Sequence, residues 1–488
     1  MKMQNNTLAE AVSYIRKELC SIYDESEIIQ TSQILFKHYF GISKKELILD
    51  GDKRFSESDL LKIIYAVKDL KKRKPLAYIL GEWEFYGYPF KVNEHTLIPR
   101  QETEELVQLI IQENTKKTPL ILDIGTGSGC ISISLKKNIP VSTVFAVDIS
   151  SEAINIARQN AILNSVEVKF IEADILQSLP MEESLDIIVS NPPYIPKGEK
   201  NSMESNVIDF EPHVALFVEN ENPFLFYETI AGFALSKLKS DGKLYVEIHE
   251  KYGNEIKELF EDIGFLNVRI IKDIHNKDRI ICGEKNQIEN DNLLQSINYV
   301  ITLFSTSKKN FKYHNSLHTF RVVSVAFKIG KFYNLSDEDM EILMISAWFH
   351  DVGYLKTIEN HELYSSLEAE SFLSQIKYPS LKIELVKECI LSTKIGTTPA
   401  HLLSKILVDS DLSALGSTKH FIYSEKLRQE LSENGLTQIN KEEWVEIEID
   451  FLKKHVYHTE YAQTRFEPIK QKHLQYRIDE LSKIKNKI

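Results

Sequence analysis

The chain has 488 residues, of which 43% are hydrophobic and 27% charged, and its formal net charge is −12. This length exceeds one ordinary core, so two or three domains are expected, and the acidic balance argues against a general nucleic-acid-binding protein. No apolar run is long enough to cross a bilayer, and the start of the chain lacks a signal-peptide apolar region. We expect a cytoplasmic protein with no membrane partner and with reduced thiols at its four cysteines, Cys20, Cys130, Cys282 and Cys389.

The first 75 residues indicate a small helical domain. Thr7 is a candidate N-cap with Glu10 three residues on, which is the pattern of a capping box. Residues 25–40 and 56–71 also have helical apolar spacing. Because this stretch has no catalytic cluster, we interpret residues 1–75 as a packing or substrate-docking module.

Residues 76–98 are aromatic, rich in β-formers and interrupted by glycines, which predicts a β-hairpin. Pro99 ends this extended piece, and the acidic run after it favours a helix start.

From Pro119 the pattern alternates between strand and helix, which is the signature of an α/β fold with a parallel sheet. We therefore expect a Rossmann-like domain over residues 76–285 with about seven strands, the last two able to form a hairpin. The expected strands are 120–123, 143–147, 167–172, 185–189, 242–249, 266–271 and 278–282.

A glycine-rich loop joins the first strand to its helix, at Gly125, Thr126, Gly127, Ser128 and Gly129. Glycines let the backbone approach a ligand closely, and the helix start offers free N–H groups. Asp148 ends the next strand, where it can accept hydrogen bonds from ribose hydroxyls. The spacing Gly-x-Gly-x-Gly favours a nucleoside ligand such as S-adenosylmethionine over a dinucleotide.

The stretch Asn191-Pro192-Pro193-Tyr194 follows a buried strand. Two prolines cannot continue a sheet ladder, so the backbone leaves the sheet where ligands of open α/β sheets bind. The Asn191 oxygen and the Pro192 carbonyl can accept the two hydrogens of a planar –NH2 group, and Tyr194 can cover that group. A proline-closed turn around a core tyrosine is the simpler alternative.

Two later features have open interpretations. Residues 195–209 form a long polar stretch, which predicts a functional lid or a disordered loop. Glu247 is expected near the ligand edge of the sheet, either as an acid that supports the site or as a solvated strand-end acid.

Residues 1 to about 285 resemble the peptide chain release factor glutamine methyltransferases. The resemblance rests on Leu76-Ala-Tyr-Ile-Leu-Gly81, Phe85-Tyr-Gly87, Leu97-Ile-Pro-Arg100, Asp123 to Gly129, Asn191 to Tyr194 and Glu211-Pro-His-Val-Ala-Leu216. It implies that Gly125 to Gly129, Asp148 and Asn191 contact S-adenosylmethionine and that Ile175 lies beside the adenine. It also implies that Asn191, Pro192, Pro193 and Tyr194 hold the glutamine of the Gly-Gly-Gln motif of class I release factors. Gln101 departs from the family pattern, which usually has a proline there.

The expected catalysis depends on orientation. An amide nitrogen is a poor nucleophile, so Asn191 and the Pro192 carbonyl would hold both N–H groups and aim the nitrogen at the methyl group. No side-chain general base is required. The alternative is an adenine or cytosine amino-group methyltransferase, which would extrude its base and carry a basic recognition region. The acidic chain and helical head favour the first interpretation, without direct nucleic-acid binding.

After a polar stretch at 285–292, read as a linker, the chain looks all-helical over residues 293–488. Few core contacts are expected across such a linker, which predicts that the two halves fold separately. The second half carries histidines and aspartates on separate helices, which suit a divalent metal ion with open positions for water and phosphate. The candidate ligands are His318, His350, Asp351, Asp409 and Asp411.

This half resembles the HD-superfamily metal-dependent phosphohydrolases over about 190 residues. The order His318, His350-Asp351 and a late aspartate matches the ligand order of that superfamily, with Asp409 preferred and Asp411 as the alternative. The resemblance implies a nucleotide or other phosphate ester as substrate. A non-catalytic nucleotide-binding module is the alternative. His314, Asn360, His361 and Glu362 lie in stretches that the related sequences share, and they are candidate phosphate-binding or supporting residues.

Overall fold

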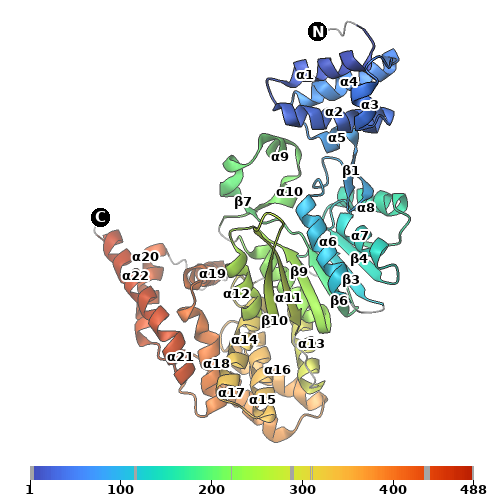
Figure 1. The fold of residues 1–488 in the computed structure, drawn as a ribbon. Helices are drawn as coiled ribbons and strands as arrows, with labels where there is room; N and C mark the ends of the chain where they lie inside the picture. Colours follow the sequence, from blue (N-terminus) through green and yellow to red (C-terminus); the bar gives the residue numbers. More distant parts are fainter. Residues whose placement is uncertain are drawn as a thin grey trace.

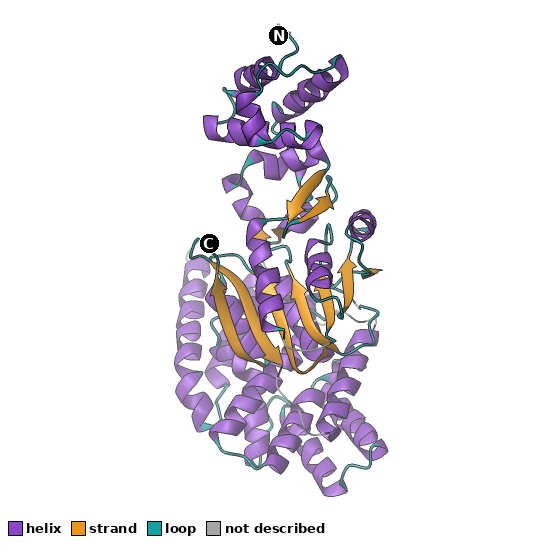
Figure 2. Cartoon of the chain, turned by 45° about the vertical axis from the view of Figure 1, so that its right-hand side comes forward, coloured by secondary structure: helices purple, strands orange, loops and turns teal. Residues whose placement is uncertain are grey.

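The computed structural model describes residues 5–114, 118–177, 179–220, 223–285, 291–307, 309, 311–433 and 440–485. The N-terminal helices lie at one end, the strands gather in the middle, and most of the C-terminal helices lie at the other end, with the last ones reaching back beside the sheet (Figures 1 and 2). No helix of the described residues combines the length and apolar character needed to cross a membrane.

The N-terminal region is a helical bundle, as its apolar spacing predicts. The hydroxyl of Thr7 accepts the Glu10 N–H and so begins the first helix, and the buried faces pack around Ile15 and Phe36. The helices are α1 (Leu8–Leu19), α2 (Glu25–Phe40), α3 (Lys44–Leu49), α4 (Glu57–Leu70) and α5 (Leu76–Leu80).

The expected hairpin is present but shorter than the aromatic stretch. Strands β1 (Glu82–Phe85) and β2 (Tyr88–Lys91) pair in antiparallel fashion. Tyr86 and Gly87 between them both have positive φ, which is the backbone of a tight two-residue hairpin turn. The first residues of the stretch form α5 instead, which ends at Gly81 in the left-handed conformation.

The central sheet has seven strands in the order β10-β11-β9-β6-β3-β4-β5. Its parallel strands are β3 (Leu120–Ile124), β4 (Thr143–Asp148), β5 (Lys169–Glu172), β6 (Leu185–Ser190) and β9 (Leu238–Glu247). Strand β11 (Asp278–Lys285) is antiparallel to both β9 and β10 (Phe265–Lys272), so the sheet is mixed. Its helices are α6 (Gln101–Glu113), α7 (Cys130–Asn138), α8 (Ser151–Leu163), α11 (Leu225–Lys237) and α12 (Gly253–Ile263).

The polar stretch after Tyr194 contains a short strand and short helices, so the expectation of a disordered loop is wrong, while a functional lid stays a prediction. The short strand β7 (Ile195–Pro196) pairs with β8 (Phe217–Val218), which closes this segment at its base. Between them lie η1 (Lys197–Ser202), α9 (Ser205–Phe210) and α10 (His213–Leu216).

The C-terminal region is helical, and its described residues from 291 onward contain no strand. The first elements are α13 (Asp291–Thr306), α14 (Ser316–Phe332), α15 (Asp337–Phe349), η2 (Val352–Leu355), α16 (His361–Gln375) and α17 (Ser380–Ser392). The remainder are α18 (Leu402–Asp411), η3 (Leu412–Gly416), α19 (His420–Glu433), α20 (Lys441–Lys454), α21 (Glu460–Arg465) and α22 (Glu467–Lys485).

The sheet region and the C-terminal region share one apolar cluster, so the expectation of few contacts between them is wrong. Helix α14 packs against α11, where a Cβ atom on Gly232 would lie 2.9 Å from Phe320. Lys328 on α14 forms an ion pair of 3.1 Å with Asp262 on α12. The expected linker falls largely on residues 286–290, which lie outside the described residues.

Candidate functional site

The first candidate site is a cavity of about 230 Å³ at the carboxyl ends of β3, β4 and β6. This is the edge of a parallel sheet where ligands bind. Most residues that the sequence predicts for cofactor and substrate meet there: Gly125, Thr126, Gly127, Ser128, Asp148, Ile175, Asn191, Pro192 and Pro193.

Two predicted site residues stand apart from that cavity. Gly129 is the N-cap residue directly before α7, and a Cβ atom there would lie 2.9 Å from Ile133 and 3.2 Å from Ala157, so this glycine allows α7 and α8 to pack closely. Tyr194 lines a neighbouring cavity together with His249 and Arg279.

Asp148 anchors the glycine loop as well as facing the cavity. Its two carboxylate oxygens accept the Gly127 N–H at 2.8 Å and the Ser150 N–H at 3.0 Å. Gly125 and Gly127 have φ values of 73° and 55°, a conformation that other residues rarely adopt. Burial raises the pKa of Asp148, and the backbone hydrogen bonds oppose that rise.

A second buried carboxylate, Asp123, supports the loop from below. It accepts the Thr126 hydroxyl at 2.6 Å and the Ser132 N–H at 3.2 Å. Burial raises the pKa of Asp123 to about 6. The sequence signal for this residue is its place at the end of a buried strand just before the glycines. The buried Ser128 hydroxyl has no hydrogen-bond partner within the described residues, which leaves it free for a ligand.

The Asn191 side chain belongs to a hydrogen-bond chain that joins three elements. Its Nδ2 donates to the Thr103 hydroxyl of α6 at 3.2 Å, and that hydroxyl donates to Glu247 of β9 at 2.7 Å. The Tyr194 hydroxyl donates to the other Glu247 carboxylate oxygen at 3.3 Å. Glu247 is only 2% exposed, so it is a supporting acid and not a solvated one. Burial raises its pKa, although the Thr103 hydrogen bond lowers it.

The segments beside the cavity are tied together by a buried carboxylate. Glu211 pairs with Arg100 at 2.5 Å and accepts the Ile98 N–H at 3.2 Å. Helix α6 begins at Gln101, so the departure from the usual proline leaves the helix start intact.

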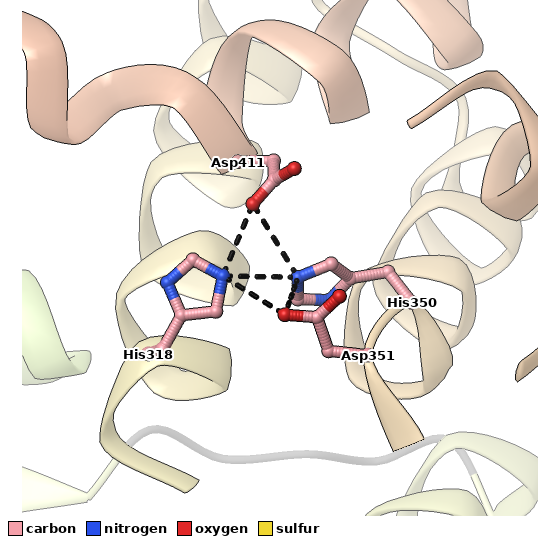
Figure 3. Close-up of side chains that lie close together, drawn as sticks. All are labelled: His318, His350, Asp351 and Asp411. Atoms are coloured by element: carbon pink, nitrogen blue, oxygen red, sulfur yellow. Dashed lines mark hydrogen bonds and ion pairs between the residues drawn. The ribbon is translucent and has the colours of Figure 1, made fainter. Parts of the chain in front are cut away.

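The second candidate site is a cluster of two histidines and two aspartates in the C-terminal region (Figure 3). His318 lies on α14, His350 is the C-cap residue directly after α15, Asp351 follows it, and Asp411 is the last residue of α18. One ligand atom from each lies within 4.8 Å of all the others. Asp351 Oδ2 is 3.2 Å from Nε2 of both His318 and His350.

Asp411, and not Asp409, completes this cluster, which corrects the preferred assignment. Asp411 Oδ1 lies 3.0 Å from His318 Nε2. Asp409 instead accepts the His458 N–H at 2.9 Å and the Thr459 N–H at 2.7 Å, next to the start of α21. Two residues correspond to about 200° around a helix, so only one of the pair can face the histidines.

The neighbouring imidazoles affect the ionisation of Asp411. Burial alone would raise the pKa of Asp411, but its contacts with His318 and His350 bring that pKa below its ordinary value. Because His318 and His350 are almost fully buried, the site is shielded from solvent, and Asp411 is its more exposed member.

A ring stack lies beside the cluster. His314 stacks on Tyr354 with ring centroids 3.8 Å apart, and the His361 ring lies 3.9 Å from Tyr354 in a tilted arrangement. Glu430 is buried and lies 2.5 Å from His314 Nδ1, a contact that the sequence does not indicate because 116 positions separate the two residues. His361 lies 3.6 Å from Asp351.

The other two supporting candidates lie at the start of α16. Asn360 receives a hydrogen bond of 3.1 Å from Lys394, and the Glu362 carboxylate is 3.5 Å from His361.

Two family models match the first part of the chain. Residues 10–81 match the PrmC N-terminal domain, and residues 101–209 match the methyltransferase small domain. A methyltransferase structure from Pyrococcus furiosus is 18% identical with a TM-score of 0.32, covering 48% of this chain and 100% of that chain.

Curated relatives cover slightly more than half of the chain. A release factor glutamine methyltransferase of Flavobacterium psychrophilum is 47% identical over 267 residues, which are 54% of this chain and 94% of that protein. A release factor glutamine methyltransferase of Bacteroides thetaiotaomicron is 42% identical over 274 residues, which are 56% of this chain and 98% of that protein. Because nearly the whole length of these relatives is matched, the chain belongs to the release factor glutamine methyltransferase family.

Proposed function

We propose that this protein transfers a methyl group from S-adenosylmethionine to the side-chain amide nitrogen of a glutamine in peptide chain release factors. The observation that carries this proposal is the position of Asn191 and Pro192 in one cavity with the glycine loop and Asp148. The groups that would accept the hydrogens of the glutamine amide therefore line the same cavity as the sheet edge that would bind the nucleoside. The names of the curated relatives support the choice of acceptor.

The residues present fit S-adenosylmethionine. Asp148 can accept from ribose hydroxyls, Ile175 offers an apolar contact for the adenine, and the unpartnered Ser128 hydroxyl is available to the ligand. When bound, S-adenosylmethionine supplies an electrophilic methyl group.

The chain's own residues act by orientation. Asn191 Oδ1 and the Pro192 carbonyl accept the two N–H groups of the glutamine amide, so the nitrogen faces the methyl group. Such positioning can correspond to effective molarities on the order of 10⁵ M or more. As the new N–C bond forms, the bond between the methyl carbon and sulfur breaks and its electron pair stays on sulfur, which leaves S-adenosylhomocysteine. Positive charge builds on nitrogen, both acceptors bind its hydrogens more tightly, and one proton then leaves to solvent.

The test is methyl transfer with tritiated S-adenosylmethionine and purified class I release factor as acceptor. DNA is offered in a parallel reaction, because an adenine or cytosine amino group poses the same geometric problem. Label on the release factor, absent when its acceptor glutamine is replaced, supports the proposal. Label on DNA alone would overturn it in favour of a nucleic-acid methyltransferase.

We further propose that the C-terminal region is an HD-type metal-dependent phosphohydrolase acting on a nucleotide or other phosphate ester. The supporting observation is the cluster of His318, His350, Asp351 and Asp411, whose ligand atoms converge from separate helices. Imidazole and carboxylate donors with a common centre fit a divalent metal ion. When bound, such an ion lowers the pKa of water and polarises a phosphoryl oxygen.

The side chains around the cluster have distinct parts in this proposal. The four cluster residues would hold the ion, and His318, His350 and Asp351 would shield it because they are buried, whereas Asp411 is partly exposed. The Glu430 carboxylate holds the His314 imidazole in place, and the His361 imidazole lies 3.6 Å from the Asp351 carboxylate. In this proposal both imidazoles donate hydrogen bonds to phosphate oxygens of the substrate.

The test is a phosphatase screen of the full chain with Mn²⁺, against nucleotides and simple phosphate esters. The paired substitutions His350→Ala and Asp351→Ala should remove both metal content and phosphate release, while methyl transfer persists. Nucleotide binding by the wild-type chain with no phosphate release would favour a non-catalytic nucleotide-binding module instead.

A further inference from the structure

Asn191 can serve as an acceptor only if its amide is held in one of two orientations. An asparagine amide has an oxygen on one side and an –NH2 group on the other, and the two have nearly the same shape. If the –NH2 group faced the substrate, it would meet the N–H groups of the glutamine amide donor to donor. A neighbouring residue must therefore distinguish the two ends.

Thr103 provides that distinction. A threonine hydroxyl has a single hydrogen, and here that hydrogen is donated to Glu247 at 2.7 Å. The Thr103 oxygen is then available to Asn191 only as an acceptor, and it receives the Asn191 Nδ2–H at 3.2 Å. The –NH2 end of Asn191 is thereby held toward α6, and Oδ1 is left for another donor.

Glu247 keeps the Thr103 hydrogen directed away from Asn191. Its carboxylate is buried at 2% exposure, and it accepts from Thr103 on one oxygen and from Tyr194 on the other. An ionised carboxylate accepts hydrogen bonds and has no hydrogen to donate. The series of hydrogen bonds from Asn191 through Thr103 to Glu247 therefore cannot reverse its direction while Glu247 is ionised.

We propose that Thr103 and Glu247 are positioning residues that orient the Asn191 amide for the methyl acceptor. This inference rests on the proposed methylation of a glutamine amide. It assigns a purpose to a buried carboxylate that makes no direct contact with the cavity lined by Asn191 and Thr103.

The experiment compares Thr103→Val, Thr103→Ser and Tyr227→Phe in the full chain. Valine keeps the shape of threonine without the hydroxyl, and serine keeps the hydroxyl. Tyr227 is the matched control, since its buried hydroxyl donates to the backbone carbonyl of Glu247 at 3.3 Å. This hydrogen bond is not one of those that join Asn191, Thr103 and the Glu247 carboxylate. For each protein, kcat and KM for methyl transfer to release factor, the S-adenosylmethionine Kd and the Tm are measured.

Thr103→Val should lower kcat on the order of a hundredfold, the loss that a small misplacement of a reacting group can cause. KM should change less, and the S-adenosylmethionine Kd should stay at the wild-type value. Thr103→Ser should restore most of the kcat. Tyr227→Phe should lower the Tm while leaving kcat unchanged.

Three results would overturn the inference while the wild-type chain methylates release factor. They are a wild-type kcat for Thr103→Val, a kcat for Thr103→Ser as low as that of Thr103→Val, or an equal loss of kcat in Tyr227→Phe. A wild-type chain that leaves release factor unmethylated but methylates another acceptor would instead refute the proposed function, and the inference with it.

Discussion

Exchanging each aspartate of α18 for asparagine separates the proposed metal binding from helix packing. Asp411→Asn and Asp409→Asn are matched substitutions, two residues apart, and each preserves the shape of its side chain. Asp411 lies 3.0 Å from His318 and 3.6 Å from His350, whereas Asp409 bonds to the chain at His458 and Thr459. Asp411→Asn should therefore lose the metal, and Asp409→Asn should keep it.

The expected magnitudes follow from these contacts. Changes just outside a ligand shell typically cost about 10- to 100-fold in metal affinity, so loss of a charged ligand should cost at least as much. Metal at about 100 times its Kd stabilises a protein by about 2.7 kcal/mol, and a Kd raised about 100-fold reduces that to roughly 0.4 kcal/mol. In a region of this size about 1 kcal/mol corresponds to about 2–4 °C, so a Tm increase of about 5–11 °C should shrink to about 1–2 °C.

Asp409→Asn should lower the Tm of the metal-free protein and leave the Tm increase on adding metal unchanged. One carboxylate oxygen of Asp409 accepts both the N–H and the hydroxyl of Thr459, at 2.7 and 2.6 Å. An amide –NH2 group in that position would leave a buried donor unpaired, which costs about 1–3 kcal/mol. The Tm without metal should therefore fall, while the increase on adding Mn²⁺ should remain.

The assay is thermal unfolding with and without Mn²⁺, followed by elemental analysis of the gel-filtered protein. Wild-type protein treated with a chelator gives the metal-free reference. If Asp409→Asn lost the Mn²⁺-induced increase while Asp411→Asn kept it, the assignment of Asp411 as the ligand would be wrong.

Four further changes test the methyl-transfer site and the packing between the two regions. Asn191→Ala should reduce methyl transfer by orders of magnitude with little change in S-adenosylmethionine Kd, and Asp148→Ala should mainly weaken that Kd; calorimetry with unchanged affinity in Asp148→Ala would refute its role. Gly232→Leu should lower the free energy of unfolding by about 1–3 kcal/mol, and with it the Tm, because a Cβ atom there would lie 2.9 Å from Phe320; an unchanged melting curve would contradict this packing. Residues 1–285 alone should aggregate, because α11 and α12 lose the cover of α14; a monomer of wild-type stability by gel filtration would show that the shared cluster is dispensable.

The cavity was predictable because its signals are local in the sequence. The glycines at 125, 127 and 129 follow a buried strand and precede a helix, and Asp148 ends the next strand. Asn191 stands directly after the central strand β6. Parallel strands bring their carboxyl ends to one edge, so these residues meet without any information about distant contacts.

The supporting residues were not predictable in the same way, because their partners are distant in sequence. Thr103 and Glu247 are 144 positions apart, and either could be a surface residue as far as sequence is concerned. The choice between Asp409 and Asp411 likewise depends on which face of α18 meets α14, which only the packing decides.

The contact between the two regions did have a sequence signal. Helix α11 carries apolar residues on more than one face: Tyr227, Ile230, Ala231 and Ala234 are buried, and Phe233 and Leu235 also pack against the shared cluster. A helix that is apolar all round is covered on both sides. The polar segment at 285–292 instead led to the prediction that the two regions fold separately. A polar linker carries no information about whether the helices on either side of it pack together.

The most direct test of the central claim is mass spectrometry of a class I release factor after incubation with the full chain and S-adenosylmethionine. The account predicts one added methyl group on the side chain of a single glutamine, present with the wild-type chain and lost with Asn191→Ala. An unmodified glutamine with the wild-type chain, under conditions where S-adenosylmethionine binds, would contradict it.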